Sequence, residues 1–152
     1  MEFIPVNEPI FDGNEKKYLC ECIDTGWISS EGPFVKSFEK NMAAYVGRKH
    51  GIAVSSGTAA LEAALQAMNF ETGSEVILPT FTIISCAQAI TKCGLVPVVV
   101  DSKKDTWNMD VDAIEEMITS KTRAIMVVHI YGLPVEMDKV LQLATKYNLK
   151  VI

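Results

Sequence analysis

From residue 50 onward, short apolar runs alternate with segments that carry a helical pattern. Two of these runs, Val96-Pro97-Val98-Val99-Val100 and Ala124-Ile125-Met126-Val127-Val128, are apolar at every position. Strands without polar alternation are buried on both faces, which is typical of a parallel sheet covered by helices. Regular alternation of strands and helices therefore predicts a three-layer α/β fold with a mainly parallel sheet.

The same pattern gives approximate bounds for each element. The expected strands cover residues 52–55, 75–78, 96–100 and 124–128, and a further strand begins at residue 150. The expected helices cover residues 15–24, 35–46, 58–69, 82–93, 110–119 and 135–147. Asn14 and Asp110 are the expected N-caps, and glycines follow three helices as stop signals, at Gly26, Gly47 and Gly94. We divide the chain into an N-terminal helical segment, residues 1–49, and an α/β domain, residues 50–152.

The last residues, Leu149-Lys150-Val151-Ile152, have the pattern of an incoming buried strand. A strand needs its full length to bury its apolar side chains and to complete its backbone hydrogen bonds. We therefore expect the chain to be an N-terminal fragment of a longer protein, with a sheet that is incomplete at its C-terminal end.

Charge and composition exclude several classes of function. The net charge of -5 disfavours nucleic acid and anionic membranes as main partners. The N-terminus lacks the basic start of a signal peptide, and no stretch approaches the ~20 apolar residues of a membrane span. The spacing of the four cysteines and two histidines forms no zinc motif, so we expect no metal site. These features favour a cytoplasmic protein with reduced thiols.

A candidate anion site lies in the segment Ser55-Ser56-Gly57-Thr58-Ala59-Ala60. Ligands of open α/β sheets bind at the carboxyl ends of the strands, and this segment joins an expected strand to an expected helix. The free amides of residues 58–60 and the helix dipole favour an anion, and Ser56 and Thr58 add hydroxyls. Gly57 is expected to permit a tight turn and the close approach of a ligand. Small hydroxylated residues also cap helices in ordinary loops, so a plain helix cap fits the same residues.

The common nucleotide motifs are missing from the sequence. Neither G-x-G-x-x-G after the first strand nor G-x-x-x-x-G-K-[ST] occurs. This argues against a dinucleotide-dependent dehydrogenase and against a P-loop enzyme. A phosphate site without these motifs leaves small phosphorylated cofactors, among them pyridoxal 5′-phosphate (PLP).

Seven segments resemble, in sequence and in order, those of the DegT/StrS family of sugar aminotransferases. They are GWISSEGP at 26–33, AVSSGTAAL at 53–61, EVILPTFT at 75–82, PVVVD at 97–101, DTWNMD at 105–110, KTRAI at 121–125 and VHIYG at 128–132. The match spans nearly the whole chain, and the linked motifs are more specific than any one alone. Within the family the chain looks most like the perosamine synthases, which aminate the 4-keto group of a GDP-linked deoxysugar.

The resemblance implies the first part of the large domain of a fold-type I PLP-dependent transferase. It also implies a homodimer with shared active sites, a nucleotide-sugar substrate, glutamate as amino donor and a place in lipopolysaccharide O-antigen biosynthesis. The family carries the aspartate that pairs with the pyridine nitrogen, and the aldimine-forming lysine, beyond the strand that begins at Lys150. We therefore expect no catalytic residue in this chain. Two alternatives stay open: a PLP-dependent sugar dehydratase or deoxygenase of the same family, and an inactive fragment that only folds or dimerises.

The resemblance also assigns cofactor-binding residues. Gly57, Thr58 and Ala59 resemble the phosphate-binding turn of the family. Ile83 falls where many members carry a flat-packing side chain over the cofactor ring. Isoleucine can pack there but cannot stack, and a core position in the helix of residues 82–93 is the alternative.

Four further residues resemble positions at the substrate pocket. Trp27, Ser29 and Ser30 match the segment that borders the sugar-nucleotide pocket, although Trp27 also suits a dimer or core aromatic. His129 follows a strand in a loop where a role near the cofactor or substrate is expected. A hydrogen-bonded structural histidine at a strand end is the alternative.

Overall fold

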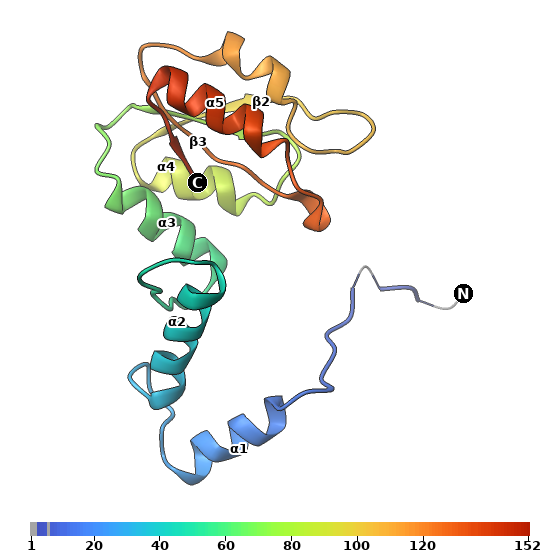
Figure 1. The fold of residues 1–152 in the computed structure, drawn as a ribbon, viewed down its shortest axis with the longest axis vertical. Coiled ribbons are helices and arrows are strands. Elements are labelled where there is room, and N and C mark those ends of the chain that lie inside the picture. The colour runs from blue at the N-terminus through green and yellow to red at the C-terminus, as the bar shows by residue number, and fades with distance from the viewer. Residues whose placement is uncertain (1–2, 6) are drawn as a thin grey trace. The chain divides into compact units, whose positions relative to one another are not determined.

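A computed structural model of the chain describes residues 3–5 and 7–152 (Figure 1). The chain divides into two compact units, a first unit up to Ala53 and a second unit from Val54 to Ile152. We describe each unit by itself.

The first unit contains two helices, α1 (Glu15–Asp24) and α2 (Pro33–Tyr45). Both were predicted, but α2 begins two residues earlier than expected. Pro33 occupies the first turn of α2, where its fixed φ suits a helix and its missing N–H has no partner to lose. Gly26 and Gly47 adopt positive φ values of 73° and 64° behind the two helices, as predicted for stop signals.

The predicted cap of α1 is only partly correct. Asn14 occupies the N-cap position, but its side chain makes no capping hydrogen bond. Its backbone oxygen accepts the amide of Tyr18 instead. The helix therefore begins where it was expected to, without the side-chain bond that the sequence pattern implied.

The second unit is an α/β structure with four parallel strands in the order β2-β1-β3-β4. Its strands are β1 (Glu75–Pro79), β2 (Val96–Val100), β3 (Thr122–Ile125) and β4 (Lys150–Val151). Its helices are α3 (Gly57–Ala67), α4 (Ser85–Lys92) and α5 (Met137–Tyr147). Three short 3-10 turns complete it: η1 (Val111–Ala113), η2 (Glu115–Met117) and η3 (Ile130–Gly132). The parallel sheet predicted from the unbroken apolar strands is confirmed.

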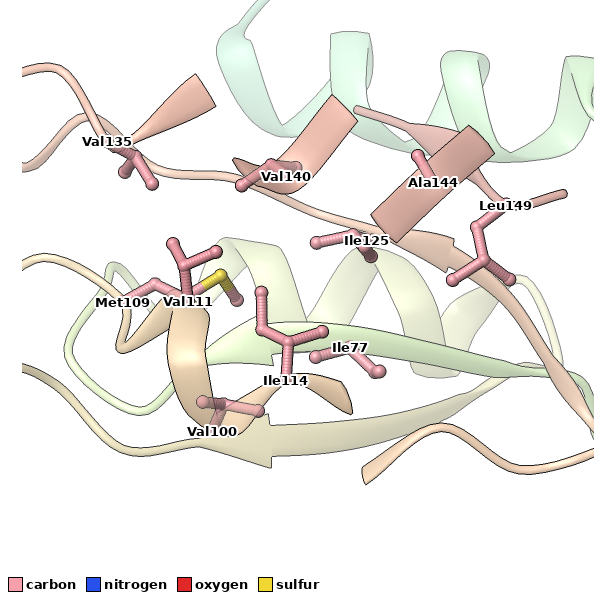
Figure 2. Packing of buried hydrophobic residues seen from close by; sticks show 10 residues of the cluster. All are labelled: Ile77, Val100, Met109, Val111, Ile114, Ile125, Val135, Val140, Ala144 and Leu149. Atoms are coloured by element: carbon pink, nitrogen blue, oxygen red, sulfur yellow. The ribbon is translucent and has the colours of Figure 1, made fainter. Parts of the chain in front are cut away.

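The sheet buries side chains on both of its faces. In β1, Val76 and Leu78 pack with buried residues of α3 and α4, whereas Ile77 points to the opposite face. There Ile77 joins a cluster that α5 covers, as Figure 2 shows. The members of that cluster are Ile77, Val100, Met109, Val111, Ile114, Ile125, Val135, Val140, Ala144 and Leu149. The second unit is therefore three layers deep, with α3 and α4 on one face and α5 on the other.

The predicted strand at residues 52–55 is wrong. Residues 51–54 form no regular structure, and the side chain of Ile52 is 83% exposed. A strand needs a neighbour to complete its backbone hydrogen bonds, and none of the described strands pairs with this segment. The apolar residues of this segment led to the expectation of a buried strand, but Ile52 and Val54 are exposed.

The predicted helix at residues 110–119 is replaced by the two turns η1 and η2. Asp110 caps η1 as expected, because its carboxylate accepts the amide of Asp112 at 3.2 Å. Val111 and Ile114 both lie in the buried cluster below α5. A 3-10 turn has three residues per turn, so residues three apart point in the same direction. Two tight turns therefore bring both side chains into the core.

Three other bounds shift by a few residues. Helix α4 begins at Ser85 instead of residue 82. Helix α5 begins at Met137 instead of residue 135, because Glu136 at the N-cap position has a non-helical ψ of 73°. Strand β3 ends at Ile125, although the next two amides still donate to backbone oxygens of β1 and of Ile152.

The cysteines Cys20, Cys22, Cys86 and Cys93 are free thiols. Within the described ranges, no three metal-binding side chains gather into one group. None of the helices in the described part of the chain has the length and apolarity that a membrane crossing requires.

Candidate functional site

The strand order places a switch point between β1 and β3. The chain passes from β1 to β2 on one side and then returns to add β3 on the other side of β1. In open α/β sheets, ligands bind outside the carboxyl ends of the strands at such a point. The loops that follow these strands, residues 80–84 and 126–134, therefore border the expected ligand position.

The turn at the start of α3 has the free donors of an anion site, but fewer than the sequence predicted. Ser56 is the N-cap residue, and its hydroxyl accepts the amide of Ala59 at 3.2 Å. Its backbone oxygen accepts the amide of Ala60 at 3.0 Å. Among the described residues, the amides of Gly57 and Thr58 have no acceptor. Helix capping therefore uses two of the three amides that were expected to be free, and two donors remain at the positive end of the helix dipole.

Gly57 has a different role from the one its conformational freedom implied. Its φ is not among the positive values, so the turn itself does not require glycine. A Cβ placed on Gly57 would meet nothing within 4 Å. The space beside the Cα of Gly57 is therefore open, and a side chain would fit there in this structure.

The hydroxyl of Thr58 reaches a second helix. Its Oγ1 donates to Oγ of Ser85 at 2.9 Å, and Ser85 is the first residue of α4. Both residues are half-buried. The bond joins the N-terminal ends of α3 and α4. Ser85 was not predicted as a site residue, because the sequence pattern placed it in the interior of a longer helix.

Ile83 precedes α4 and does not belong to the core. Its side chain is 68% exposed, so the alternative of a buried helix residue is wrong. It lies two residues before Ser85, in the loop that follows β1. An exposed apolar side chain at the carboxyl edge of the sheet remains free to contact a ligand.

His129 is exposed and takes part in local hydrogen bonds. Its Nδ1 accepts the amide of Val135 at 3.2 Å, and its backbone oxygen accepts the amide of Gly132 at 3.0 Å. An accepting Nδ1 carries no proton, so the hydrogen of a neutral imidazole in this bond lies on Nε2. The arrangement matches the structural role considered above and leaves Nε2 as a donor.

A buried asparagine ties two strand-end loops together. The Nδ2 atom of Asn108 donates to the backbone oxygens of Leu133 at 3.0 Å and Pro134 at 3.4 Å. Its Oδ1 accepts the amide of Ile130 at 3.2 Å. Asn108 thus fixes the loop that carries His129. The motif at 105–110 contains this residue, but its partners lie more than 20 residues away, and no local pattern reveals them.

Lys103 and Lys104 are the lysines nearest to the carboxyl end of a strand. Lys103 donates to Glu136 at 2.7 Å and to Asp112 at 3.3 Å. The hydrogen bond to Glu136 is the main cause that raises the pKa of Lys103 above its ordinary value. A lysine must lose its proton before its amine can attack a carbonyl, so this ion-pair network disfavours Lys103 as a nucleophile.

A hollow of about 590 Å³ lies beside these lysines at the ends of β1 and β2. Phe81 and Trp107 form an aromatic pair with ring centroids 5.4 Å apart. The lining residues are Thr80, Phe81, Asp101, Ser102, Lys103, Lys104 and Trp107. The pair gives this hollow an apolar wall, and the lysines give it a basic rim.

Trp27, Ser29 and Ser30 lie in the loop between α1 and α2, in the first unit. All three are exposed, and Trp27 packs beside Gly32, where an added Cβ would lie 3.4 Å from the tryptophan Cβ. The proposed substrate residues of this loop therefore have side chains free to contact a ligand.

Comparison with known proteins agrees with this architecture. Residues 9–152 match the DegT/DnrJ/EryC1/StrS aminotransferase family. A GDP-perosamine synthase of Caulobacter vibrioides is 49% identical over 98% of this chain and 40% of its own length. A GDP-perosamine synthase of Escherichia coli O157:H7 is 45% identical over 100% of this chain and 42% of its own length. The chain thus spans about 40% of the length of the curated relatives it matches.

Solved structures with this fold include cofactor-bound enzymes. NtdA of Bacillus subtilis with bound PMP superposes with a TM-score of 0.84 and 38% identity, over 90% of this chain and 31% of that one. The E. coli GDP-4-keto-6-deoxy-D-mannose-3-dehydratase with bound hydrated PLP superposes with a TM-score of 0.87 and 25% identity, over 97% of this chain and 39% of that one.

Proposed function

Because the chain belongs to the DegT/DnrJ/EryC1/StrS aminotransferase family, we propose that the full-length protein is a PLP-dependent aminotransferase acting on a nucleotide-linked keto-sugar. The product is a 4-amino sugar, and glutamate is the amino donor. The single observation that supports this substrate class best is the 49% identity to a GDP-perosamine synthase over 98% of the chain. The proposal includes a cytoplasmic homodimer with shared active sites, built from a helical segment at 1–49 and a cofactor domain that begins at residue 50.

The residues at the start of α3 fit the phosphate group of PLP. Two amides without acceptors, on Gly57 and Thr58, lie at the positive end of a helix dipole. The space in front of Gly57 is open. The amide of Ala59 joins them when the hydroxyl of Ser56 releases it. When bound, PLP supplies the electron sink that the chemistry of an amino group requires.

Two other candidate residues, both in the second unit, are proposed to contact the cofactor or the substrate, and the residues of the first unit are assigned by the resemblance alone. Ile83, exposed beside the start of α4, packs against the face of the cofactor ring. His129 donates from Nε2 to a substrate oxygen while Val135 holds its other nitrogen in place. Trp27, Ser29 and Ser30 border the sugar-nucleotide pocket. These assignments rest on the resemblance of the motifs and on the exposure of the side chains.

A sugar dehydratase of the same fold is the second candidate. The observation that favours it is the structural similarity to the E. coli dehydratase, with a TM-score of 0.87. Its identity of 25% is well below the 49% and 45% of the two GDP-perosamine synthases. The aminotransferase therefore ranks first.

The experiment supplies full-length protein with PLP, ¹⁵N-glutamate and a GDP-linked 4-keto-6-deoxymannose. We expect ¹⁵N in the sugar product and an equal amount of 2-oxoglutarate, both measured by mass spectrometry. Loss of a sugar hydroxyl without incorporation of nitrogen would establish the dehydratase instead. Absence of both reactions, and of PLP binding, would reject the proposal.

A matched pair of variants tests the cofactor turn separately from the chemistry. Gly57→Asp places a negative charge in the open space, and Gly57→Asn places a neutral group of the same shape there. A carboxylate in the first turn of a helix interacts favourably with the helix dipole, but it repels a bound phosphate. We expect Gly57→Asp to keep the thermal stability of the protein and to lose PLP binding, with Gly57→Asn losing much less. Equal affinities in a PLP titration would show that the phosphate binds elsewhere.

A further inference from the structure

The loop that follows β3 closes on itself through the side chain of His129. The Nδ1 atom of His129 accepts the backbone amide of Val135 at 3.2 Å, and its backbone oxygen accepts the amide of Gly132 at 3.0 Å. Tyr131 and Gly132 have positive φ values of 48° and 85°, so the chain turns back tightly between the two partners. Val135 is 4% exposed, and a buried amide needs an acceptor. The imidazole of His129 is therefore part of the structure of this loop.

A second loop contributes the side chain that holds both ends of this closure. Asn108 is 5% exposed and lies in the loop that follows β2. Its Oδ1 accepts the amide of Ile130, and its Nδ2 donates to the backbone oxygens of Leu133 and Pro134. The oxygen and both hydrogens of the side-chain amide are thus used, and a flipped amide would oppose all three partners. Ile130 and Pro134 are the sequence neighbours of the two residues that close the loop.

The closing bond determines where the imidazole carries its hydrogen. A backbone amide can only donate, so Nδ1 of His129 is the acceptor and the hydrogen of the neutral ring lies on Nε2. An imidazolium carries a hydrogen on both nitrogens and cannot accept this bond. His129 is exposed at the carboxyl edge of the sheet, so the Nε2–H group is available to a ligand. The ring therefore offers one donor and, while the loop is closed, no free acceptor for a proton.

We propose that Asn108 is a positioning residue for substrate binding, and that it holds His129 as a fixed neutral donor with no acid–base role. This inference rests on the proposed function, because it assigns a further residue to the same substrate pocket. The ligand atom is an uncharged acceptor, a hydroxyl or carbonyl oxygen of the nucleotide-linked sugar, which accepts a hydrogen bond from Nε2. Asn108 is buried, so it acts on the substrate only through the loop.

Asparagine and glutamine each replace one nitrogen of the imidazole, which separates its two bonds. In His129→Asn, the side-chain oxygen takes the place of Nδ1 and accepts the amide of Val135, but the donor to the substrate is lost. In His129→Gln, the side-chain nitrogen takes the place of Nε2, and the acceptor for Val135 is lost. Full-length protein with PLP, glutamate and a GDP-linked 4-keto-6-deoxymannose gives KM and kcat. A neutral hydrogen bond corresponds to about 2- to 12-fold in affinity, so we expect His129→Asn to raise KM for the sugar by that factor and to leave kcat unchanged.

Asn108→Ser tests the positioning role with a matched control. We expect it to raise KM by no more than His129→Asn does, and to add nothing in the double mutant, because both changes act on one donor. Asn41→Ser makes the same replacement at an exposed residue of α2 and should leave KM and kcat unchanged. Thermal midpoints show which variants remain folded. If Asn108→Ser unfolds, Asn108→Asp takes its place, since it keeps the volume of the side chain and replaces the donor group by a second oxygen.

A spectroscopic measurement tests the tautomer without any reaction. In full-length protein labelled with ¹⁵N-histidine, we expect a pyridine-type Nδ1 and a pyrrole-type Nε2 for His129, whose signals are identified by their loss in His129→Gln. In Asn108→Ser, both nitrogen shifts should move toward the average of the two tautomers. A loss of stability alone would not cause this change in the folded protein.

Several results would contradict the inference. A hydrogen on Nδ1 of His129 in the parent would overturn it, and so would an unchanged tautomer in Asn108→Ser. A fall in kcat for His129→Asn at unchanged KM would make His129 an acid–base group. Parent-like kinetics of His129→Asn would exclude the substrate contact, and effects that add in the double mutant would separate Asn108 from His129. Absence of amino transfer in the parent would reject the proposed function, whereas the tautomer is measured independently of it.

Discussion

The two units of the chain both contain amphipathic helices, yet only the second unit buries them. Helix α1 has no buried residue, and α2 has only Ala43. In the second unit, β1 buries four consecutive residues and α4 buries three. The apolar spacing that predicts a helix is thus present in both units, whereas burial depends on a sheet to pack against. Periodicity alone predicts the helix and leaves its environment open.

The difference matters for stability because short helices need tertiary packing. Helices α1 and α2 have 10 and 13 residues, near or below the length at which an isolated helix is marginal in water. The aromatic rings of Tyr18 and Phe34 lie 5.3 Å apart and join the two helices. Such a contact adds about 0.5–1.5 kcal/mol beyond its area, well below what a buried cluster contributes.

Hydrogen exchange should show the largest contrast between the units. We expect the amides of Ile77 and Ile125 to exchange at least about 10³-fold more slowly than those of Leu19 and Phe38. The strand amides open only with the whole sheet, whereas the helices of the first unit open locally. Exchange followed by NMR on this chain measures both classes in one sample. Equal protection would mean that the first unit shares the stability of the sheet.

Truncation of one apolar side chain in each unit gives the next largest effect. Ile77→Ala should lower the free energy of unfolding by about 2–5 kcal/mol, because Ile77 is 0% exposed between two strands and α5. Leu19→Ala in α1 should change it by less than about 0.5 kcal/mol, because Leu19 is 67% exposed.

The tryptophans let one unfolding experiment follow each unit. Trp27 lies in the first unit and Trp107 in the second. In a Trp27→Phe background, fluorescence in a urea titration reports the second unit alone. A large effect of Leu19→Ala in that background would contradict the independent behaviour that the burial pattern implies.

A buried and an exposed asparagine side chain allow the same comparison between the two units. Asn108→Leu removes three hydrogen bonds and leaves the amide of Ile130 without its acceptor, so we expect a loss of about 1–3 kcal/mol. Asn41→Leu in α2 removes one long bond to Ser37 at 3.4 Å and should cost less than about 0.5 kcal/mol. Thermal unfolding measures both variants. A neutral Asn108→Leu would show that the two loops hold their positions without it.

The smallest effect concerns the exposed ion pairs, all of which lie in the second unit among the described residues. Hydrogen bonds from Lys139 and Lys103 lower the pKa of Asp112, and those from Lys103 and Lys139 lower the pKa of Glu136. Because these two carboxyl pKa values are lower in the folded protein, the ion pairs stabilise the fold at pH values above the ordinary pKa values of 3.8 and 4.5. This stabilisation is lost as the pH falls through the lower pKa values of the folded protein. The raised pKa values of the two lysines add stability that is lost as the pH rises beyond 10.5.

Glu136→Gln should therefore lower the thermal stability at pH values between the ordinary pKa values of glutamate and lysine, and it should have no effect in acid. Thermal midpoints recorded against pH, at low and at high salt, measure this contribution. We expect salt to reduce it, because exposed pairs are screened. An effect of Glu136→Gln that persists at pH 2 would point to packing instead of charge.

Elements bounded by strong local signals were predictable from sequence, and those that depend on distant partners were not. The strand at residues 96–100 has its predicted bounds because its apolar run lies between Gly94 and Asp101, although only Val100 of this strand is fully buried. Residues 52–55 carry the same kind of pattern but pair with no described strand. The helix expected at 110–119 is replaced by two 3-10 turns, and the spacing of Val111 and Ile114 suits either structure, so the pattern alone did not distinguish them.

The candidate site divides in the same way. The turn at residues 56–58 was predictable, since an N-cap serine and a following glycine are local signals. Ser85 and Asn108 were missed because their partners come from other elements, Thr58 in α3 and Ile130 in a distant loop. A sequence shows which groups can donate and accept, and only the fold shows which of them meet.

The position of β1 between β2 and β3 also determines the order in which the sheet can be completed during synthesis. Val76 lies beside Pro97 on one side and beside Ala124 on the other, which follows about 50 residues later. At roughly 5–20 residues per second, β2 leaves the ribosome about 1–4 seconds before β3, which begins 22 residues later. During that interval β1 has one unpaired edge and two apolar faces, the features of a strand prone to pair with another chain. The central strand is therefore the part of the nascent chain that most needs protection by a chaperone.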